Sequence, residues 1–194
     1  MEVSALLLAA GAGRRIGGPK ALRRDPDGTA WVTRSARVLA AGGCDPVLVV
    51  VGAQGDDVAE LVPPSARVVV AAGWAEGMGV SLRAGLTALE HAGDAVAAVV
   101  GLVDTPGVTA AAVARLVAAV EAAVASGRGP AVLARATYAG VPGHPVVLGR
   151  DHWGPVAAAA RGDTGARGYL ATRAVAAVEC GDVGDGRDVD TREA

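Results

Sequence analysis

The chain has 194 residues, 52% of them hydrophobic, so it is long enough to bury a core as one domain, 1–194. The formal net charge is −2, which gives the chain as a whole no electrostatic case for binding nucleic acid or an acidic membrane. Cys44 and Cys180 form no metal-binding pattern, the amino terminus lacks the charged region and cleavage site of an export signal, and the apolar stretch 3–10 is too short to cross a bilayer. We therefore expect a soluble cytoplasmic protein with free thiols.

Short apolar runs alternate along the chain with alanine-rich segments of helical period. In chain order, the runs predict strands at 3–9, 47–51, 67–71, 95–103, 131–134, 146–148 and 175–179. Between them, helices are predicted at 32–41, 56–62, 81–92, 110–125, 153–160 and 165–172, with Thr109 as an N-cap and a turn-rich excursion at 140–145. This alternation predicts a three-layer α/β/α fold with a mainly parallel sheet, whose ligands bind beyond the carboxyl ends of the strands.

A glycine-rich turn with several cations follows the first predicted strand. Gly11 and Gly13 precede Arg15 and Lys20, and Lys20 is the only lysine in the chain. Glycines let backbone N–H groups approach a bound anion, and cations supply the charge that a polyphosphate requires. The spacing fits neither the dinucleotide fingerprint G-x-G-x-x-G nor the P-loop G-x-x-x-x-G-K-[ST]. The turn therefore predicts a nucleotide-triphosphate site of another type, with a plain strand-to-helix turn as the alternative.

Asp104 directly follows the apolar predicted strand 95–103. A carboxylate at the mouth of a buried strand is costly unless something binds it, and Mg²⁺ is its natural partner beside a triphosphate. The alternative is that Asp104 caps the next helix, but Thr109 is better placed to do so. Asp104 is therefore a candidate metal ligand.

Six segments in order resemble the MobA-like nucleotidyltransferases, especially the molybdenum cofactor cytidylyltransferases. They are L-A-A-G-x-x-x-R-x-G-x-P-K (8–20), W-A-E-G-M-G-V-S-L-R-A-G-L (74–86), D-T-P (104–106), G-H-P-V (143–146), G-D-T-G-A-R (162–167) and D-V-D-T (188–191). The chain departs from the family pattern at Gly13 (usually Ser), Thr105 (usually Gln) and Arg192 (usually Pro), and it contains no Asn. The resemblance covers nearly the whole chain.

The resemblance implies a Rossmann-like nucleotide-diphospho-sugar transferase (GT-A-like) fold and a Mg²⁺-dependent enzyme. Its reaction would transfer CMP from CTP to a molybdopterin-type cofactor and release pyrophosphate. Two alternatives stay open: a sugar-phosphate or polyol-phosphate acceptor, and a non-catalytic chaperone that carries nucleotide or cofactor to a molybdoenzyme. The glycine spacing disfavours a fourth possibility, an NAD(P)-binding protein.

The resemblance also implies a role for individual residues. Catalysis would use Arg15, Lys20 and Asp104, and the metal would be held by Asp104 and Asp190, with Asp188 as an alternative to Asp190. The nucleotide would be bound by Leu8, Ala9, Ala10, Gly11, Gly13, Arg15, Lys20, Gly79 and Ser81, where the alanine at position 10 favours CTP over GTP. The acceptor would be bound by His144, Asp163 and Arg167, although His144 as a plain turn residue and Arg167 as a partner of Asp163 stay open.

Overall fold

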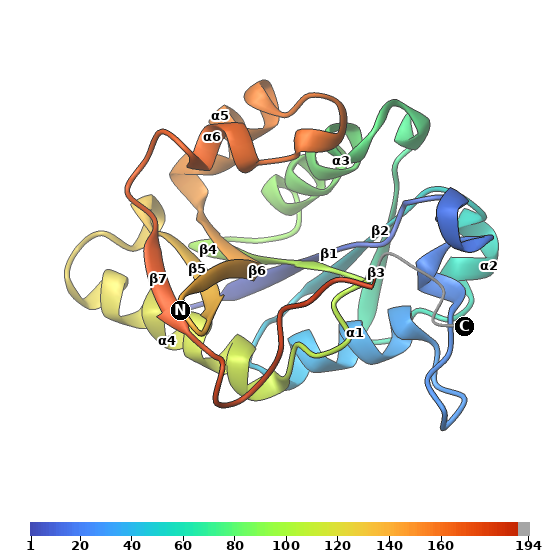
Figure 1. The fold of residues 1–194 in the computed structure, drawn as a ribbon. Coiled ribbons are helices and arrows are strands. Elements are labelled where there is room, and N and C mark those ends of the chain that lie inside the picture. Colours follow the sequence, from blue (N-terminus) through green and yellow to red (C-terminus); the bar gives the residue numbers. More distant parts are fainter. Residues whose placement is uncertain (190–194) are drawn as a thin grey trace.

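A seven-stranded sheet lies between two layers of helices in the computed structural model, which describes residues 1–189 apart from the side chain of Ile16 (Figure 1). The strands are β1 (Val3–Leu8), β2 (Val47–Val51), β3 (Ala66–Val70), β4 (Ala97–Leu102), β5 (Leu133–Tyr138), β6 (Val141–Gly149) and β7 (Ala176–Glu179). Their order across the sheet is β3-β2-β1-β4-β6-β5-β7, and β6 alone runs antiparallel to its neighbours. The predicted α/β fold with a mainly parallel sheet is confirmed.

The helices divide between the two faces of the sheet. They are α1 (Trp31–Ala41), α2 (Gly55–Ala59), α3 (Met78–Glu90), α4 (Ala110–Ala125), α5 (Trp153–Ala159) and α6 (Arg167–Leu170). α1, α2 and α4 cover one face, and α3, α5 and α6 cover the other. The Thr109 hydroxyl accepts a hydrogen bond from the Ala112 amide at 3.2 Å, so its predicted role as an N-cap is confirmed. Among residues 1–189, no helix combines the length and the apolar character that a membrane span needs.

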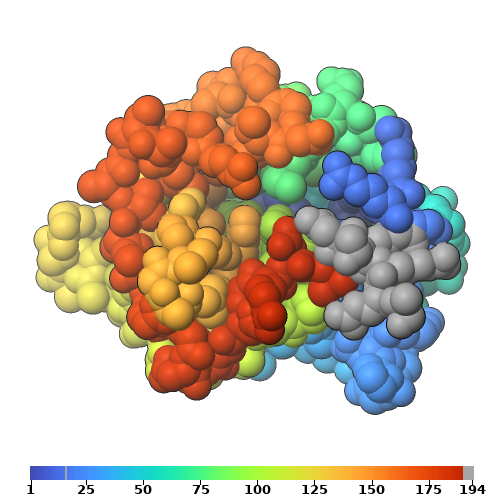
Figure 2. All heavy atoms as spheres, viewed as in Figure 1, coloured from blue at the N-terminus to red at the C-terminus, as the bar shows by residue number. Residues whose placement is uncertain are grey.

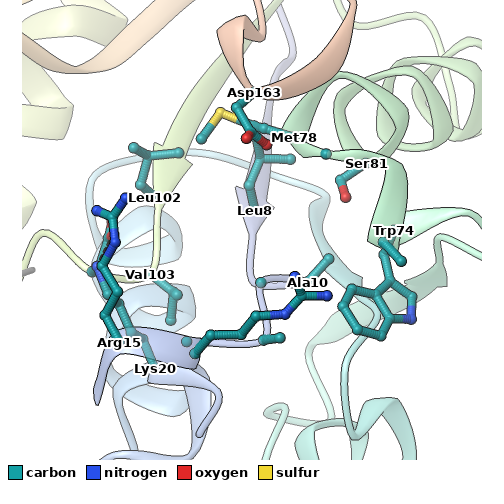
Figure 3. Close-up of a pocket in the computed structure, with 17 residues that line it drawn as sticks. Leu8, Ala10, Arg15, Lys20, Trp74, Met78, Ser81, Leu102, Val103 and Asp163 are labelled. Carbon is teal, nitrogen blue, oxygen red and sulfur yellow. Dashed lines mark hydrogen bonds and ion pairs between the residues drawn. The ribbon is translucent and has the colours of Figure 1, made fainter. Parts of the chain in front are cut away.

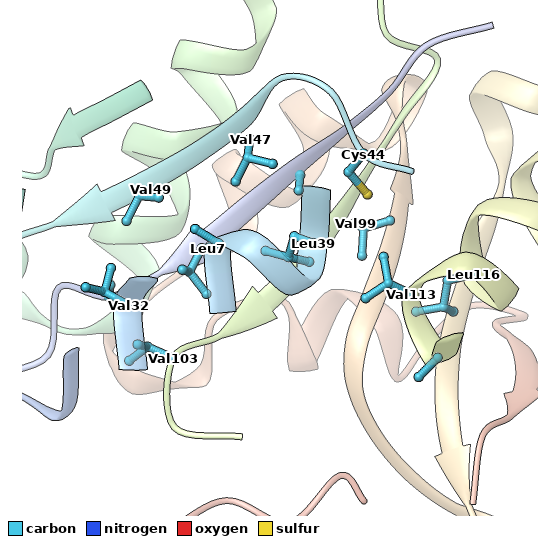
Figure 4. Packing of buried hydrophobic residues seen from close by; sticks show 14 of the residues in the cluster. Leu7, Val32, Leu39, Cys44, Val47, Val49, Val99, Val103, Val113 and Leu116 are labelled. Atoms are coloured by element: carbon cyan, nitrogen blue, oxygen red, sulfur yellow. The ribbon is translucent and has the colours of Figure 1, made fainter. Parts of the chain in front are cut away.

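Alternation along the central strands divides the core between the two faces. Leu7 of β1 packs with α1 and α4, as Figure 4 shows, whereas Leu6 and Leu8 pack toward α3. Because both faces are covered, every residue in β1 and β2 is buried, and all of them except Ser4 are apolar. The continuous apolar runs of the sequence come from this double burial.

The predicted excursion at 140–145 is wrong, because 141–145 belong to strand β6 and only Gly140 lies in a turn. β5 and β6 form a hairpin whose turn is Ala139-Gly140, with φ of 51° and 78°, the backbone that a two-residue hairpin turn requires. The carboxylate of Glu179 accepts bonds from both turn amides at 2.9 and 3.0 Å, and from the Gly181 amide and the Thr137 hydroxyl. These bonds lower the pKa of Glu179 to about 2. The hairpin is therefore fastened to the end of β7.

Gly85 allows α3 to lie directly against the sheet. A Cβ at this position would overlap Leu6 Cδ1 and lie 2.9 Å from Val50 Cγ2. Gly85→Ala should therefore lower the free energy of unfolding by about 1–2 kcal/mol, because overpacking outweighs the better helix propensity of alanine. Urea denaturation measures this change. Gly154→Ala is the matched control in α5, since a Cβ there meets no atom of the described residues within 4 Å, and equal stability of the two variants would contradict the packing argument.

Candidate active site

A cleft of about 490 Å³ opens at the carboxyl ends of β1 and β4. Its walls come from the segments 8–20, 74–81 and 102–104, together with Asp163. Figure 3 shows Arg15 and Lys20 on one side of the cleft and Trp74 and Ser81 on the other. This is the edge of a parallel sheet where the first and fourth strands deliver polar groups to a ligand.

The glycine-rich loop begins where β1 ends and is held at its base by the neighbouring strand. The Ala9 amide donates to the Val50 carbonyl at 2.9 Å, and the Ala53 amide donates to the Ala10 carbonyl at 3.0 Å. Gly13 then takes a left-handed backbone with φ of 56°, which turns the chain into the short 3₁₀ helix Arg14–Ile16. Within residues 1–189, the amides of 11–13 donate no hydrogen bond, so they are available to a ligand.

Lys20 and Asp104 meet in this cleft although 84 positions separate them in the sequence. The Lys20 Nζ donates to Asp104 Oδ2 at 2.8 Å, and the two side chains are 16% and 21% exposed. Lys20 opens the 3₁₀ helix Lys20–Leu22, and Asp104 follows the end of β4. The predicted nucleotide-triphosphate site requires Lys20 and Asp104 to lie in one cleft, and they do. The catalytic roles of both residues stay predictions.

The segment 185–189 runs along the loop that follows β4. The Val189 amide donates to the Asp104 carbonyl at 2.9 Å, and the Asp185 amide donates to the Gly107 carbonyl at 2.9 Å. The exposed Asp188 therefore lies next to the residue that is bonded to Asp104. Asp190, the predicted second metal ligand, lies outside the described residues.

The donor set of the cleft suits Mg²⁺. Residues 1–189 hold no cluster of three or more His, Cys, Asp or Glu side chains of the kind that forms an all-protein metal site. Mg²⁺ is instead held by one or two carboxylates, with substrate phosphates and water completing its shell. The partly exposed Asp104 is such a carboxylate. These residues fit a metal that binds together with a triphosphate.

Most of the predicted nucleotide-binding residues line the cleft, and two do not. Ala9 faces the α1 side of the sheet, because alternation after Leu8 turns it away from Ala10. Gly79 lies in α3, where a Cβ would come within 2.9 Å of the Arg161 amide nitrogen. Its glycine is therefore explained by close packing of α3 and not by approach to a nucleotide. The predicted nucleotide-binding residues that do line the cleft are Leu8, Ala10, Gly11, Gly13, Arg15, Lys20 and Ser81.

Two of the predicted acceptor residues come from the segment that follows α5. Asp163 lies in the 3₁₀ helix Gly162–Thr164 and lines the cleft, and Arg167 is the exposed first residue of α6. No ion pair joins these two side chains in the described part of the chain. The alternative, in which Arg167 forms an ion pair with Asp163, is therefore wrong.

His144 lies within strand β6 and not in a turn, so the plain-turn alternative is wrong. The Tyr138 hydroxyl donates to the His144 carbonyl at 2.8 Å. Burial lowers the pKa of His144, and the nearby Arg135 lowers it further, whereas the charge of Asp104 acts in the opposite direction. His144 is thus within electrostatic range of the cleft although it does not line it.

Sequence reasoning did not single out the apolar walls of the cleft. Trp74, Met78 and Leu102 line it, and the Trp74 side chain packs so closely on Gly52 that a Cβ there would lie 2.6 Å from it. Trp74 stands in a segment that carries the family resemblance. Its position in the cleft was nevertheless not predictable, because a tryptophan between two glycines fits a core position equally well.

The fold and this site define a nucleotidyltransferase. A family model described as the MobA-like NTP transferase domain matches residues 5–178, and the chain belongs to that family. The proposed resemblance is thereby confirmed.

Similar proteins carry different functional names. One relative, from Paenarthrobacter nicotinovorans, is named nicotine blue oxidoreductase and is 38% identical over an alignment of 203 residues. The alignment covers 98% of this chain and 93% of the relative. The crystal structure of a Mycobacterium tuberculosis Rv0371c homologue from Mycobacterium sp. strain JC1 is 31% identical, with a TM-score of 0.76 over 97% of this chain and 90% of that one. Rv0371c of M. tuberculosis in complex with manganese has the same fold, with 23% identity and a TM-score of 0.71 over 92% and 88% of the two chains.

Proposed function

We propose that the protein transfers CMP from CTP to a phosphate-bearing acceptor, a molybdopterin-type cofactor, and releases pyrophosphate. The observation that carries this proposal is the contact of Lys20 with Asp104 at 2.8 Å, in a cleft below a loop whose amides are free to bind phosphate. Cations and N–H groups already in place can neutralise charge on the α-phosphate and on the departing pyrophosphate.

The residues of the cleft divide this work between them. Arg15 offers a planar fork for phosphate oxygens, and Lys20 offers a compact point charge. An oxygen of the acceptor's phosphate would form a bond to the α-phosphorus as the bond to pyrophosphate breaks. Since that phosphate is already an anionic nucleophile, the reaction needs no general base from the protein.

A divalent cation would be held by Asp104, with Asp190 or Asp188 as the second ligand. When bound, Mg²⁺ supplies charge neutralisation at the triphosphate. The manganese complex of Rv0371c supports a divalent ion in this fold and leaves the choice of Mg²⁺ to experiment.

Calorimetry with CTP and GTP, each with and without Mg²⁺, tests the nucleotide assignment. We expect CTP to bind at least tenfold tighter than GTP, a difference of about 1.4 kcal/mol, because Ala10 and Trp74 bound the space for the base. Removal of Mg²⁺ should weaken the binding of CTP by a similar factor. Equal affinities for the two nucleotides would contradict the choice of CTP.

Pyrophosphate release identifies the acceptor. We expect release with CTP and a molybdopterin-type cofactor, and none with sugar phosphates or polyol phosphates. If pyrophosphate is released only with a sugar phosphate or a polyol phosphate, the proposed acceptor is wrong and nucleotidyl transfer still stands. Tight CTP binding with no release from any acceptor would favour the alternative of a chaperone for a molybdoenzyme.

A second candidate function is a redox reaction in the same cleft, and one observation favours it. The relative that is 38% identical over 98% of this chain is named an oxidoreductase. A loop that cradles a triphosphate can also hold the pyrophosphate of a dinucleotide. In such a reaction, reduced nicotinamide dinucleotide would give a hydride to a dye of the nicotine blue type, solvent would supply the proton, and the oxidised dinucleotide would be released. Oxidation of NADH or NADPH by this dye, at a rate abolished in Lys20→Met, would favour this candidate over nucleotidyl transfer.

A further inference from the structure

Arg135 is a cation on an interior strand of the sheet. It lies on β5, which pairs with β6 on one side and β7 on the other, and stands opposite Val146 of β6. Leu133 and Val146 belong to the apolar cluster under α5 and α6, so alternation places Arg135 on that same face. The predicted strand at 131–134 ends one residue before Arg135, whereas β5 continues to Tyr138.

The guanidinium of Arg135 is incompletely satisfied by the protein. Its Nε is buried and has no hydrogen-bond partner, and no carboxylate pairs with the side chain within residues 1–189. Burying a charged donor without a partner is costly, and such groups in native proteins indicate a ligand or an ion. An anion beside Arg135 would remove this cost.

Two further basic side chains lie close to Arg135. His144 lies on β6 in the irregular stretch where the pairing with β5 shifts register between Arg135 and Thr137, and it is close enough to Arg135 for their charges to interact. Arg167 begins α6, whose Tyr169 and Leu170 pack on that same face. The charges of both arginines act on His144, and so do the charges of the carboxylates of Asp104 and Asp188. Three basic groups from β5, β6 and α6 thus gather at one place.

This basic cluster of Arg135, His144 and Arg167 adjoins the cleft. Val146 of β6 pairs with Val100 of β4, and the charge of Asp104, which lines the cleft beyond the end of β4, acts on His144. Figure 2 shows the segment around residues 135–145 and the segment of α5 and α6 bordering the hollow on this side of the molecule. An anion at the cluster would therefore lie beside Asp104 and the triphosphate.

We propose that Arg135, together with His144 and Arg167, forms a subsite that binds the phosphate monoester of the acceptor. The inference rests on the proposed function, because it places the second substrate of the transfer. The guanidinium of Arg135 supplies a fork of N–H donors to phosphate oxygens, and Arg167 closes the site from α6. The site selects acceptors that carry a phosphate monoester.

Titration of inorganic phosphate into the full chain saturated with CTP and Mg²⁺ tests this subsite. We expect Arg135→Gln and Arg167→Gln each to weaken phosphate binding at least tenfold and to change the affinity for CTP less than twofold. Arg128→Gln is the matched control, because Arg128 is an exposed arginine that precedes β5 and bonds to Ser126. Arg167 is exposed, so its variant carries the test if Arg135→Gln does not fold.

Unchanged phosphate affinity in the folded variants, or no phosphate binding to the wild type, would overturn the subsite. The result is separable from the proposed function. If CTP does not bind but phosphate binds in a manner that depends on Arg135, nucleotidyl transfer fails and the anion subsite stands. If CTP binds and phosphate does not, the subsite fails alone.

Discussion

Asp104→Ala should lower the rate of pyrophosphate release by about a thousandfold, which corresponds to a loss of about 4 kcal/mol of transition-state stabilisation. Asp104 is the carboxylate at the end of β4 that faces the cleft and contacts Lys20. Its removal takes away the metal ligand and also leaves the partly buried ammonium of Lys20 without this carboxylate. Steady-state release of pyrophosphate at saturating CTP and Mg²⁺ measures the effect.

Asp182→Asn is the control for the loss of a carboxylate. Asp182 pairs with Arg115 at the surface, where the side chains of Arg115 and Asp182 are 38% and 64% exposed, and pairs in contact with solvent contribute little. This variant should keep the wild-type rate. If Asp104→Ala turns over at a rate close to that of Asp182→Asn, the proposal that Asp104 is a metal ligand is contradicted.

Lys20→Met should lower kcat/KM for CTP by about a hundredfold to a thousandfold, the range found when one preorganised donor is removed from a developing negative charge. The methionine side chain keeps similar length and loses the ammonium. Lys20→Arg should restore only part of the rate, because a planar guanidinium does not replace a compact charge at the same position. Initial rates over a range of CTP concentrations give kcat/KM for each variant.

Arg24→Met separates a specific contact from general attraction of the anionic substrate. Arg24 is a cation four residues from Lys20, and its side chain bonds to the Gly28 carbonyl. If only the basic charge of this segment mattered, the two methionine variants would lose similar activity. We expect Arg24→Met to retain activity within twofold, and an equal loss would contradict the assigned role of Lys20.

The central part of the fold was predictable because its strands are buried on both faces. β2 and β4 appear in the sequence as continuous apolar runs and β1 as a run with one serine, and their predicted bounds differ from the observed ones by at most two residues. The hairpin of β5 and β6 was not predicted. Gly143 and Pro145 are typical of loops, yet here they stand in a strand whose pairing depends on the distant β5.

Site residues were likewise predictable where their role depends on adjacent residues, and were not predictable where it depends on neighbours distant in sequence. The loop 8–20 and Asp104 were predictable, because each directly follows an apolar strand and carries its chemistry in adjacent residues. Ala9 was assigned to the nucleotide although it faces the opposite side of the sheet. Arg135 was missed because its environment is created by neighbours across β6 and by α6, and these are not adjacent in sequence.

A crystal structure with CTP and Mn²⁺, read by the anomalous signal of manganese, tests the shared nucleotide and metal site most directly. We expect a manganese peak bound to an Asp104 carboxylate oxygen, the triphosphate against the amides of 11–13 with Lys20 in contact, and the cytosine between Ala10 and Trp74. A triphosphate bound without metal at Asp104, or bound outside this cleft, would contradict the proposed mechanism.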